Sequence, residues 1–304
     1  MMVCPVCSSN NIEVQSEFRY LNDFFADIER VSCKNCSLHF AHPMPSPSEL
    51  DIYNNSYHQS AHGGNKRNAK QNAFFLGIAK TRLNFIRSNI ELNFKTPYKI
   101  LEIGPGPGAF VEVWVNHFKN TDYYVIETDK SCHSSLLNLG VQIIGNKALE
   151  KQNVKFDFII LSHVLEHVIN PNEFLNTYIR YLNNGGHIFI EVPCMDWRHK
   201  KIDEPHLLFF DKSSMSSLIH NLNLTKVKIG YFGTTIKSLL NPTKSFLKRL
   251  RNYLWRKGIS FYHPEKKKLL KIGLNSLEAG AIINYEPHKE HIKPSWWLRV
   301  LCKK

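Results

Sequence analysis

A glycine-rich stretch, residues 99–110, constrains the fold of this chain more than any other feature. It reads KILEIGPGPGAF, in which an apolar run predicts a short buried strand, the glycines predict a tight turn, and residues 109–118 predict a helix. Glycine has no Cβ atom, so Gly104, Gly106 and Gly108 allow positive φ and let a ligand approach the backbone closely. The free N–H groups at the start of the following helix suit an anionic or polar group of that ligand.

A carboxylate at the end of the next predicted strand fits the same kind of site. Glu127 follows Gly108 by nineteen residues and ends the segment DYYVIE. In a βαβ unit, a carboxylate at about this distance binds the ribose hydroxyls of a nucleotide. The turn also satisfies the loose dinucleotide pattern. Glu102 argues against a dinucleotide, because it lies two residues before the first glycine, at a strand end that dinucleotide folds usually keep apolar.

Two further motifs follow in order, FDFIILSHVLEHV at residues 156–168 and GGHIFIEVP at residues 185–193. Together with the glycine turn and Glu127, they resemble class I S-adenosylmethionine-dependent methyltransferases. The resemblance is close over residues 98–193 and looser over residues 10–224. It implies an α/β fold with a seven-stranded Rossmann-like sheet, and S-adenosylmethionine as the cofactor.

The resemblance also implies roles for individual residues around S-adenosylmethionine. Glu102 would lie near the methionine end, and Glu127 would bind the ribose hydroxyls. Ser162 and His163 would lie beside the methyl donor. The loop at Asn146 would meet the adenine, although this chain lacks the acidic residue that is common there. The implied cofactor-binding residues are Glu102, Gly104, Gly106, Gly108, Glu127, Asn146, Ser162 and His163.

Apolar runs mark the strands of the expected sheet. Continuous runs of this kind are typical of parallel strands that are buried on both faces. A sixth strand is expected at residues 224–232 and a seventh, antiparallel strand at residues 278–285. Helices are expected at residues 66–90, before the first strand, and at residues 211–223, before the sixth. The first five strands are expected near residues 99–103, 122–127, 141–144, 157–161 and 186–192.

The N-terminal segment carries two C-x-x-C pairs that are separated by 25 residues. Each pair places two thiolates on a tight turn, and two such turns complete a tetrahedral zinc site. A redox role for either pair is the alternative. Because four cysteines close the coordination shell, we expect a structural zinc in a ribbon that needs the metal to fold. The segment at residues 1–60 would hold this ribbon, and residues 61–304 the methyltransferase domain. The expected zinc ligands are Cys4, Cys7, Cys33 and Cys36.

The segment after the ribbon has three prolines at residues 43–47, which favour an extended chain, and a short capped helix is expected at residues 48–54. Ribbon, proline-rich exit and paired tyrosines together resemble the zinc-binding front end of bacterial methyltransferases that act on sugars and surface glycans. In that family the aromatic and histidine residues of this segment approach the substrate. Tyr53, Tyr57 and His58 are therefore candidates for substrate contacts, with loop packing as the alternative.

The net charge of +13 is concentrated in one segment. Residues 237–271 hold eleven lysines and arginines against one acid, Glu265, which amounts to +10. We expect a basic helical insert, residues 233–277, between strands six and seven. Within it, residues 242–258 read as a helix with an apolar stripe flanked by cations. Such a helix suits an anionic membrane surface, a phosphorylated substrate or plain docking on the core. The tail at residues 296–301 suits an interfacial anchor or packing on the sheet.

The composition and the first residues limit which cellular compartment and which partners are expected. No run of about 18 apolar residues is present, so no membrane-spanning helix is expected. The first residues do not resemble a signal peptide, which favours the cytoplasm, with peripheral contact at the inner face of the membrane as an option for the basic helix. The seven cysteines would stay reduced there. A small-molecule or lipid-linked glycan is the expected substrate. Nucleic acid is less favoured, because the positive charge is confined to one insert.

Methyl transfer to a hydroxyl needs the acceptor about 3 Å from the methyl group and a base that removes the proton. His206 and His163, which follow strands five and four, are the catalytic candidates, because the unperturbed pKa of histidine suits this task. Alternatively, some methyltransferases hold a divalent ion with a Glu-x-x-Glu-His motif and a later histidine. The corresponding residues here are His163, Glu166, His167 and His206, and the first of them departs from that motif.

These features favour O-methylation of a sugar or glycan precursor in bacterial surface-polysaccharide synthesis. C-methylation is less favoured, because the nucleotide-sugar C-methyltransferases carry a further C-terminal domain that this chain lacks. A zinc-ribbon RNA base methyltransferase is one alternative, which predicts salt-sensitive RNA binding. The other is a non-enzymatic adaptor that binds partners through the ribbon and the basic helix.

Overall fold

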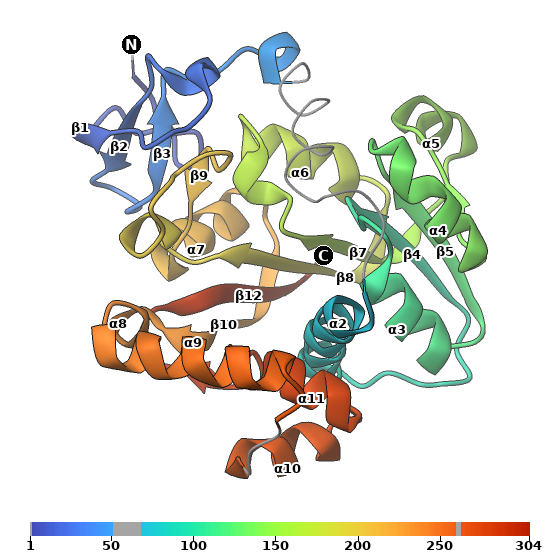
Figure 1. Cartoon of the computed structure of the whole chain (residues 1–304). Helices are drawn as coiled ribbons and strands as arrows, with labels where there is room; N and C mark the ends of the chain where they lie inside the picture. Colours follow the sequence, from blue (N-terminus) through green and yellow to red (C-terminus); the bar gives the residue numbers. More distant parts are fainter. Residues whose placement is uncertain (1, 51–67, 260–262) are drawn as a thin grey trace.

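The computed structural model describes residues 2–50, 68–259 and 263–304 (Figure 1). Its main sheet has eight strands in the order β11-β10-β12-β8-β7-β4-β5-β6. Strands β6, β5, β4, β7 and β8 are parallel, whereas β12 is antiparallel to both β8 and β10. The α/β architecture with a mainly parallel sheet is thereby confirmed. The strands are β4 (Tyr98–Ile103), β5 (Thr121–Ile126), β6 (Gln142–Ile143), β7 (Phe156–Ser162), β8 (Leu182–Pro193), β10 (Thr225–Thr235), β11 (Glu290–His291) and β12 (Ser295–Lys303).

Two details of the predicted sheet are wrong. The sheet has eight strands rather than seven, because the two-residue strand β11 pairs with the edge of β10. The segment predicted as the seventh strand instead begins with helix α11 (Ser276–Ile282). Asn275 caps this helix in a reciprocal box with Glu278, a local signal that favours a helix over the strand suggested by the short apolar run. The antiparallel strand is β12, formed by the tail that was expected either to anchor at an interface or to pack on the sheet.

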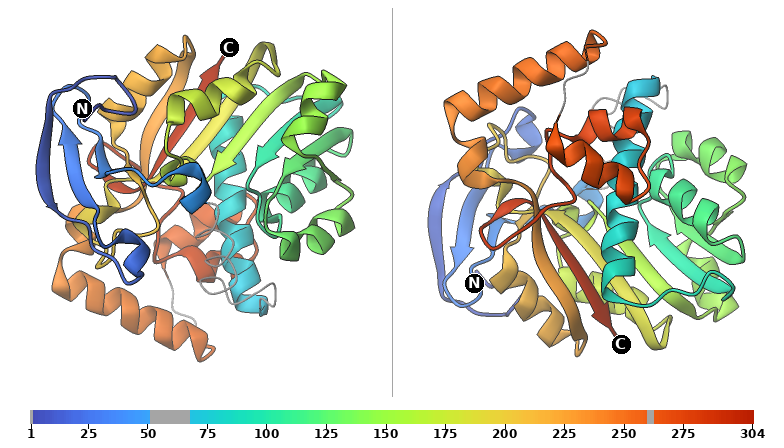
Figure 2. Two further views of the ribbon diagram at one scale, coloured as in Figure 1. Left: turned by 90° about the horizontal axis from the view of Figure 1, so that it is seen from above. Right: turned by 90° about the horizontal axis from the view of Figure 1, so that it is seen from below.

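Helices cover both faces of the sheet (Figures 1 and 2). Alternate residues of β4 face opposite sides, so that Ile100 packs with Phe110 and Trp114, whereas Leu101 joins the core that contains Leu175 of the opposite layer. The helices at residues 66–90 and 211–223 are confirmed as α2 and α7. The helices flanking the strands are α2 (Ala69–Asn89), α3 (Ala109–His117), α4 (His133–Asn138), α5 (Asn146–Gln152), α6 (Pro171–Ile179) and α7 (Lys212–Asn221).

A second, antiparallel sheet has the order β1-β2-β3-β9. Its first three strands come from the N-terminal segment, while β9 (Leu208–Phe209) comes from the connection between β8 and α7. Residues of β2, β3 and β9 belong to the same apolar cluster as one face of the main sheet. The N-terminal segment is therefore packed on the rest of the chain. The other strands are β1 (Ile12–Glu17), β2 (Glu29–Cys33) and β3 (His39–His42).

The basic insert leaves the end of β10 as a series of helices. They are α8 (Ile236–Leu239), α9 (Pro242–Arg256), α10 (Pro264–Lys271) and α11. Helix α9 confirms the predicted basic helix, and Asn241 is its N-cap. Among the helices of the described residues, none is long and apolar enough to cross a membrane.

The substrate-side segment lies largely outside the described residues. A helical turn at residues 47–50 begins the helix expected at residues 48–54. Tyr53, Tyr57 and His58 lie outside the described residues, so their predicted substrate contacts stay predictions.

Candidate active site

The glycine turn between β4 and α3 has the predicted conformation. Gly104, Gly106 and Gly108 have φ values of +64°, +56° and +85°, which glycine adopts without strain. A Cβ atom on Gly108 would lie 2.8 Å from Leu139 Cδ1, so this glycine lets α4 approach the turn. A Cβ atom on Gly106 would meet nothing within 4 Å in the described structure. The turn is therefore closed on the helix side and open at Gly106.

Glu127, directly after β5, holds the turn in place. Its Oε2 accepts a hydrogen bond from the N–H of Gly106 at 2.8 Å, and its Oε1 accepts one from the N–H of Asp129 at 2.8 Å. The carboxylate thus joins the ends of two adjacent parallel strands. A ligand that binds Glu127 Oε2 would therefore lie next to the backbone of Gly106.

Glu102, on β4, is only 2% exposed. Burial raises its pKa to about 7, against the hydrogen bond that the hydroxyl of Tyr123 donates to its Oε2 at 2.7 Å. Near neutral pH this side chain is therefore divided between its acid and carboxylate forms.

Ser162 and His163 end β7, at the same edge of the sheet as the glycine turn. The Oγ of Ser162 is buried and has no hydrogen-bond partner among the described residues. His163 has a φ of +59°, a conformation that is uncommon outside glycine. Its Nδ1 lies 3.2 Å from Glu166 Oε1, and its Nε2 lies 3.3 Å from Glu191 Oε1. Burial acts to lower the pKa of His163, but these two carboxylates raise it above its ordinary value.

Asn146 is the first residue of α5. Its Oδ1 accepts a hydrogen bond from the hydroxyl of Tyr178 at 3.2 Å. The predicted adenine-side residue is therefore already paired with α6.

A buried ion network beneath His163 was not predicted from the sequence. Glu191, on β8, is fully buried and pairs with Arg82 of α2 and Arg299 of β12, each at 2.6 Å. Burial alone would raise the pKa of Glu191, but the two guanidinium groups hold it well below its usual range. Breaking such a buried pair typically costs about 3–5 kcal/mol. The network fixes the carboxylate against which His163 is placed.

His206 forms a second, separate pair with Asp196. The Nδ1 of His206 lies 2.7 Å from Asp196 Oδ2, and Lys200 Nζ lies 2.7 Å from the same oxygen. Asp196 and His206 are 1% and 7% exposed. Burial alone would raise the pKa of Asp196, but His206 and Lys200 hold it far below its usual range. An ionised carboxylate on Nδ1 leaves Nε2 of the ring to accept a proton.

Three residues of the predicted metal motif lie together. One ligand atom from each of Glu166, His167 and His206 lies within 4.8 Å of the others, whereas His163 is outside this group. The Nδ1 atoms of His167 and His206 are held by the carbonyl of Pro205, at 3.3 Å, and by Asp196. Glu166 Oε2 is buried with no hydrogen-bond partner among the described residues. Metal-binding histidines are commonly held through the second nitrogen in this way, so these three residues fit a divalent cation.

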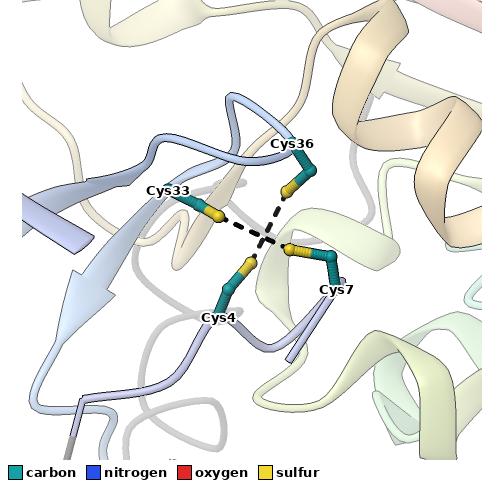
Figure 3. A group of neighbouring side chains, drawn as sticks. All are labelled: Cys4, Cys7, Cys33 and Cys36. Carbon is teal, nitrogen blue, oxygen red and sulfur yellow. Dashed lines mark hydrogen bonds between the residues drawn. The ribbon is translucent and has the colours of Figure 1, made fainter. Parts of the chain in front are cut away.

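The four N-terminal cysteines converge on one point (Figure 3). The Sγ atoms of Cys4 and Cys36 are 3.6 Å apart, and those of Cys7 and Cys33 are 3.4 Å apart. All four sulfur atoms lie within 4.8 Å of one another. The two pairs thus meet as predicted, in an arrangement that can hold a metal ion.

A cavity of about 710 Å³ lies beside the loop that follows β8. The guanidinium of Arg30 stacks over the ring of Trp197, at 4.5 Å. None of the predicted site residues lines this cavity. The lining residues are Ser16, Glu17, Arg19, Arg30, Trp197, Arg198 and Leu240.

Comparison with family models shows the family of this chain. A family model described as a methyltransferase domain matches residues 78–229, which is half of the chain. No curated protein matches the sequence. The solved structures that match include the plantazolicin methyltransferase BpumL in complex with SAH, at 17% identity over 85% of this chain and 91% of that chain, with a TM-score of 0.47. Coclaurine N-methyltransferase bound to N-methylheliamine and SAH matches at 15% identity over 86% and 95% of the two chains, with a TM-score of 0.46.

Proposed function

Because this chain belongs to the methyltransferase-domain family and is an S-adenosylmethionine-dependent methyltransferase, we propose that it O-methylates a sugar or glycan precursor of a bacterial surface polysaccharide. The family assignment removes the non-enzymatic adaptor as an alternative. The observation that carries the choice of O-methylation is the buried Asp196–His206 pair, which supplies a base for a hydroxyl acceptor. The sugar class is supported by the resemblance of the N-terminal segment to glycan methyltransferases.

The proposed cofactor site uses the open side of the glycine turn. Glu127 would exchange its contact with Gly106 for the ribose hydroxyls, and the N–H groups of the turn would face the cofactor. Glu102 and the unpaired hydroxyl of Ser162 would lie on the methionine side. S-adenosylmethionine supplies an electrophilic methyl group when it is bound.

We propose that His206, rather than His163, removes the proton from the acceptor hydroxyl. The two carboxylates beside His163 raise its pKa and contact both of its ring nitrogens, so neither nitrogen is left for an acceptor hydroxyl. His206 faces one carboxylate through Nδ1 and keeps Nε2 for the acceptor hydroxyl. In this proposal His163 positions the strand ends through Glu166 and Glu191.

We further propose that the four cysteines bind one structural zinc ion. Four thiolates at this separation close a tetrahedral shell and leave no position for a substrate. The zinc would hold the turns that start β1 and end β2.

The first test is calorimetric titration of the purified, zinc-loaded protein with S-adenosylmethionine and S-adenosylhomocysteine. We expect micromolar binding that Glu127→Ala abolishes. The matched control is Glu150→Ala, which removes an exposed carboxylate from α5. Unchanged affinity in Glu127→Ala would contradict the proposed site.

The acceptor is then sought with isotope-labelled S-adenosylmethionine. We expect label transfer to sugar nucleotides or lipid-linked sugars and none to RNA. Salt-sensitive transfer to RNA would favour the RNA methyltransferase alternative instead.

A further inference from the structure

Helix α9 turns four of its apolar side chains outward, away from the rest of the molecule. Phe246, Leu247, Leu250 and Tyr253 are 58%, 56%, 43% and 57% exposed. They recur at the spacing of one face of a helix. No described residue of α9 is buried. Figure 2 shows the helix running along the outer edge of the molecule.

The face of α9 that contacts the rest of the chain is largely polar, with Trp255 as its apolar contact to the core. Lys248 Nζ donates a hydrogen bond to Thr234 Oγ1 at 2.5 Å. Arg251 and Asn252 both bond to the side chain of Asn284. A helix that simply covers a globular core has the opposite arrangement, with its apolar stripe inward and its polar face in water. Docking on the core, one of the three predicted uses of this helix, therefore does not account for the stripe.

Cations flank the exposed stripe. Lys244, Arg249, Arg256 and Lys257 are all exposed, and the helix contains no acidic residue. A surface that combines apolar side chains with exposed positive charge is complementary to an anionic lipid surface, where acyl chains and phosphate groups are neighbours. A second copy of this chain would have to place these cations against one another. A nucleic acid would leave the apolar side chains in water.

We propose that α9 docks this protein on an anionic membrane surface. The apolar stripe enters the boundary between head groups and acyl chains, and the flanking cations lie at the level of the lipid phosphates.

The docking surface follows the edge of the sheet that carries the candidate active site. Strand β10 is antiparallel to β12, which is antiparallel to β8, so β10 runs parallel to the strands that carry the site residues. Its carboxyl end, where α8 and α9 begin, lies at the same edge as the ends of β4 and β7. Membrane docking therefore keeps this edge near the lipid surface. If the proposed function holds, that position favours a lipid-linked acceptor, whereas the docking itself does not depend on the acceptor.

The experiment is co-sedimentation of the full-length, zinc-loaded protein with large vesicles of phosphatidylcholine alone or mixed with phosphatidylglycerol. We expect binding to the mixed vesicles only. Phe246→Ser with Leu250→Ser should abolish it. Arg249→Gln with Arg256→Gln should weaken it about 25-fold, at about fivefold for each charge. Leu137→Ser, on α4, removes a side chain that is 59% exposed and should bind as the wild type does.

Three outcomes would overturn the proposal. One is equal binding by the wild type and the Phe246/Leu250 variant. Another is a dimer in size-exclusion chromatography that this variant dissolves, without vesicle binding by the wild type. The third is equal binding to heparin and to anionic vesicles with no dependence on Phe246. The substituted side chains are exposed, so unchanged melting temperatures are expected and confirm that the variants fold. Binding of S-adenosylmethionine is measured in parallel, which separates failure of docking from failure of the proposed methyl transfer.

Discussion

The buried Asp196–His206 pair orients the ring of the proposed base. Asp196→Asn removes the charge that favours the Nδ1–H tautomer, and we expect kcat for methyl transfer to fall about 10²–10⁴-fold with unchanged affinity for S-adenosylmethionine. Steady-state kinetics over a range of pH values checks this. His220→Gln, an exposed histidine on α7, is the control. Full activity in the Asp196→Asn variant would remove His206 from the chemistry.

His206 also lies with Glu166 and His167 in the group that fits a divalent cation. The kinetic experiment therefore also tests whether activity depends on a metal ion. We expect brief treatment with a chelator to leave methyl transfer intact in protein that keeps its zinc. Loss of activity that Mg²⁺ or Mn²⁺ restores would make His206 a metal ligand instead of the base.

Glu102 makes stability depend on pH in an unusual direction. Its pKa is about 7 in the folded protein against an ordinary value of 4.5, so the folded state binds the proton more tightly than the unfolded state. Its contribution to stability is therefore present below pH 4.5 and is lost as the pH rises to about 7. Relative to Glu102→Gln, we expect the wild type to lose about 3 kcal/mol of unfolding free energy across this range. Urea denaturation of both proteins, with Glu150→Gln as control, measures the difference. A constant difference at every pH would contradict the assignment.

At the residue scale, the sequence indicated the groups that belong to a local motif. Glu127 and the three glycines act within one strand–turn–helix unit, so their spacing carried the information. Glu191 gave no such signal, because its partners Arg82 and Arg299 come from elements far away along the chain. The role of Asp196 could not be predicted either, because only the folded loop after β8 brings its carboxylate to His206.

At the scale of elements, the glycine turn offers a matched pair of substitutions. Gly108→Ala would force a Cβ atom to 2.8 Å from Leu139 at a φ of +85°, and we expect it to cost about 2–4 kcal/mol of stability. Gly106→Ala meets no neighbour at a φ of +56°, so its cost in stability should be about 1 kcal/mol. In Gly106→Ala the added Cβ atom would enter the open side of the turn. We therefore expect this variant to lose more free energy of S-adenosylmethionine binding than free energy of unfolding. Thermal melts and calorimetry compare the two, and equal losses of affinity and stability in both variants would contradict the open face.

Helices and strands could be predicted from the sequence where one period of apolar residues dominated the segment. The parallel strands are apolar on both faces because helices cover both sides, so they read as continuous runs. The run after Asn275 is also apolar, and a short run of that kind does not distinguish a strand from a buried helix. The capping box with Glu278 favours the helix there. Strand β12 was harder to predict because it carries Arg299, whose ion pair with Glu191 forms only in the folded sheet.

At the scale of the whole molecule, the four-cysteine cluster should stabilise more than its own ribbon. The small sheet is completed by β9 and shares its core with the main sheet, so its loss exposes apolar surface throughout. We expect one zinc per chain in the wild type and none in Cys33→Ser, with a melting temperature lowered by about 10 °C in a single transition. Metal analysis and calorimetric melting check this, with Asn35→Ser, an exposed residue between Cys33 and Cys36, as the control. An unchanged melting temperature in zinc-free protein would show that the cluster does not support the fold.

The place of β12 in the sheet has a consequence for how the chain is made. This strand lies between β8 and β10, yet it is synthesised after both. Fifty-nine residues separate the end of β10 from the start of β12, a delay of roughly 3–12 seconds during translation. Throughout that interval the nascent chain carries two unpaired strand edges that face the same gap. A ribosome that pauses within the basic insert therefore holds the molecule in its most aggregation-prone form, and slow codons there would reduce the yield of folded protein without changing a single residue.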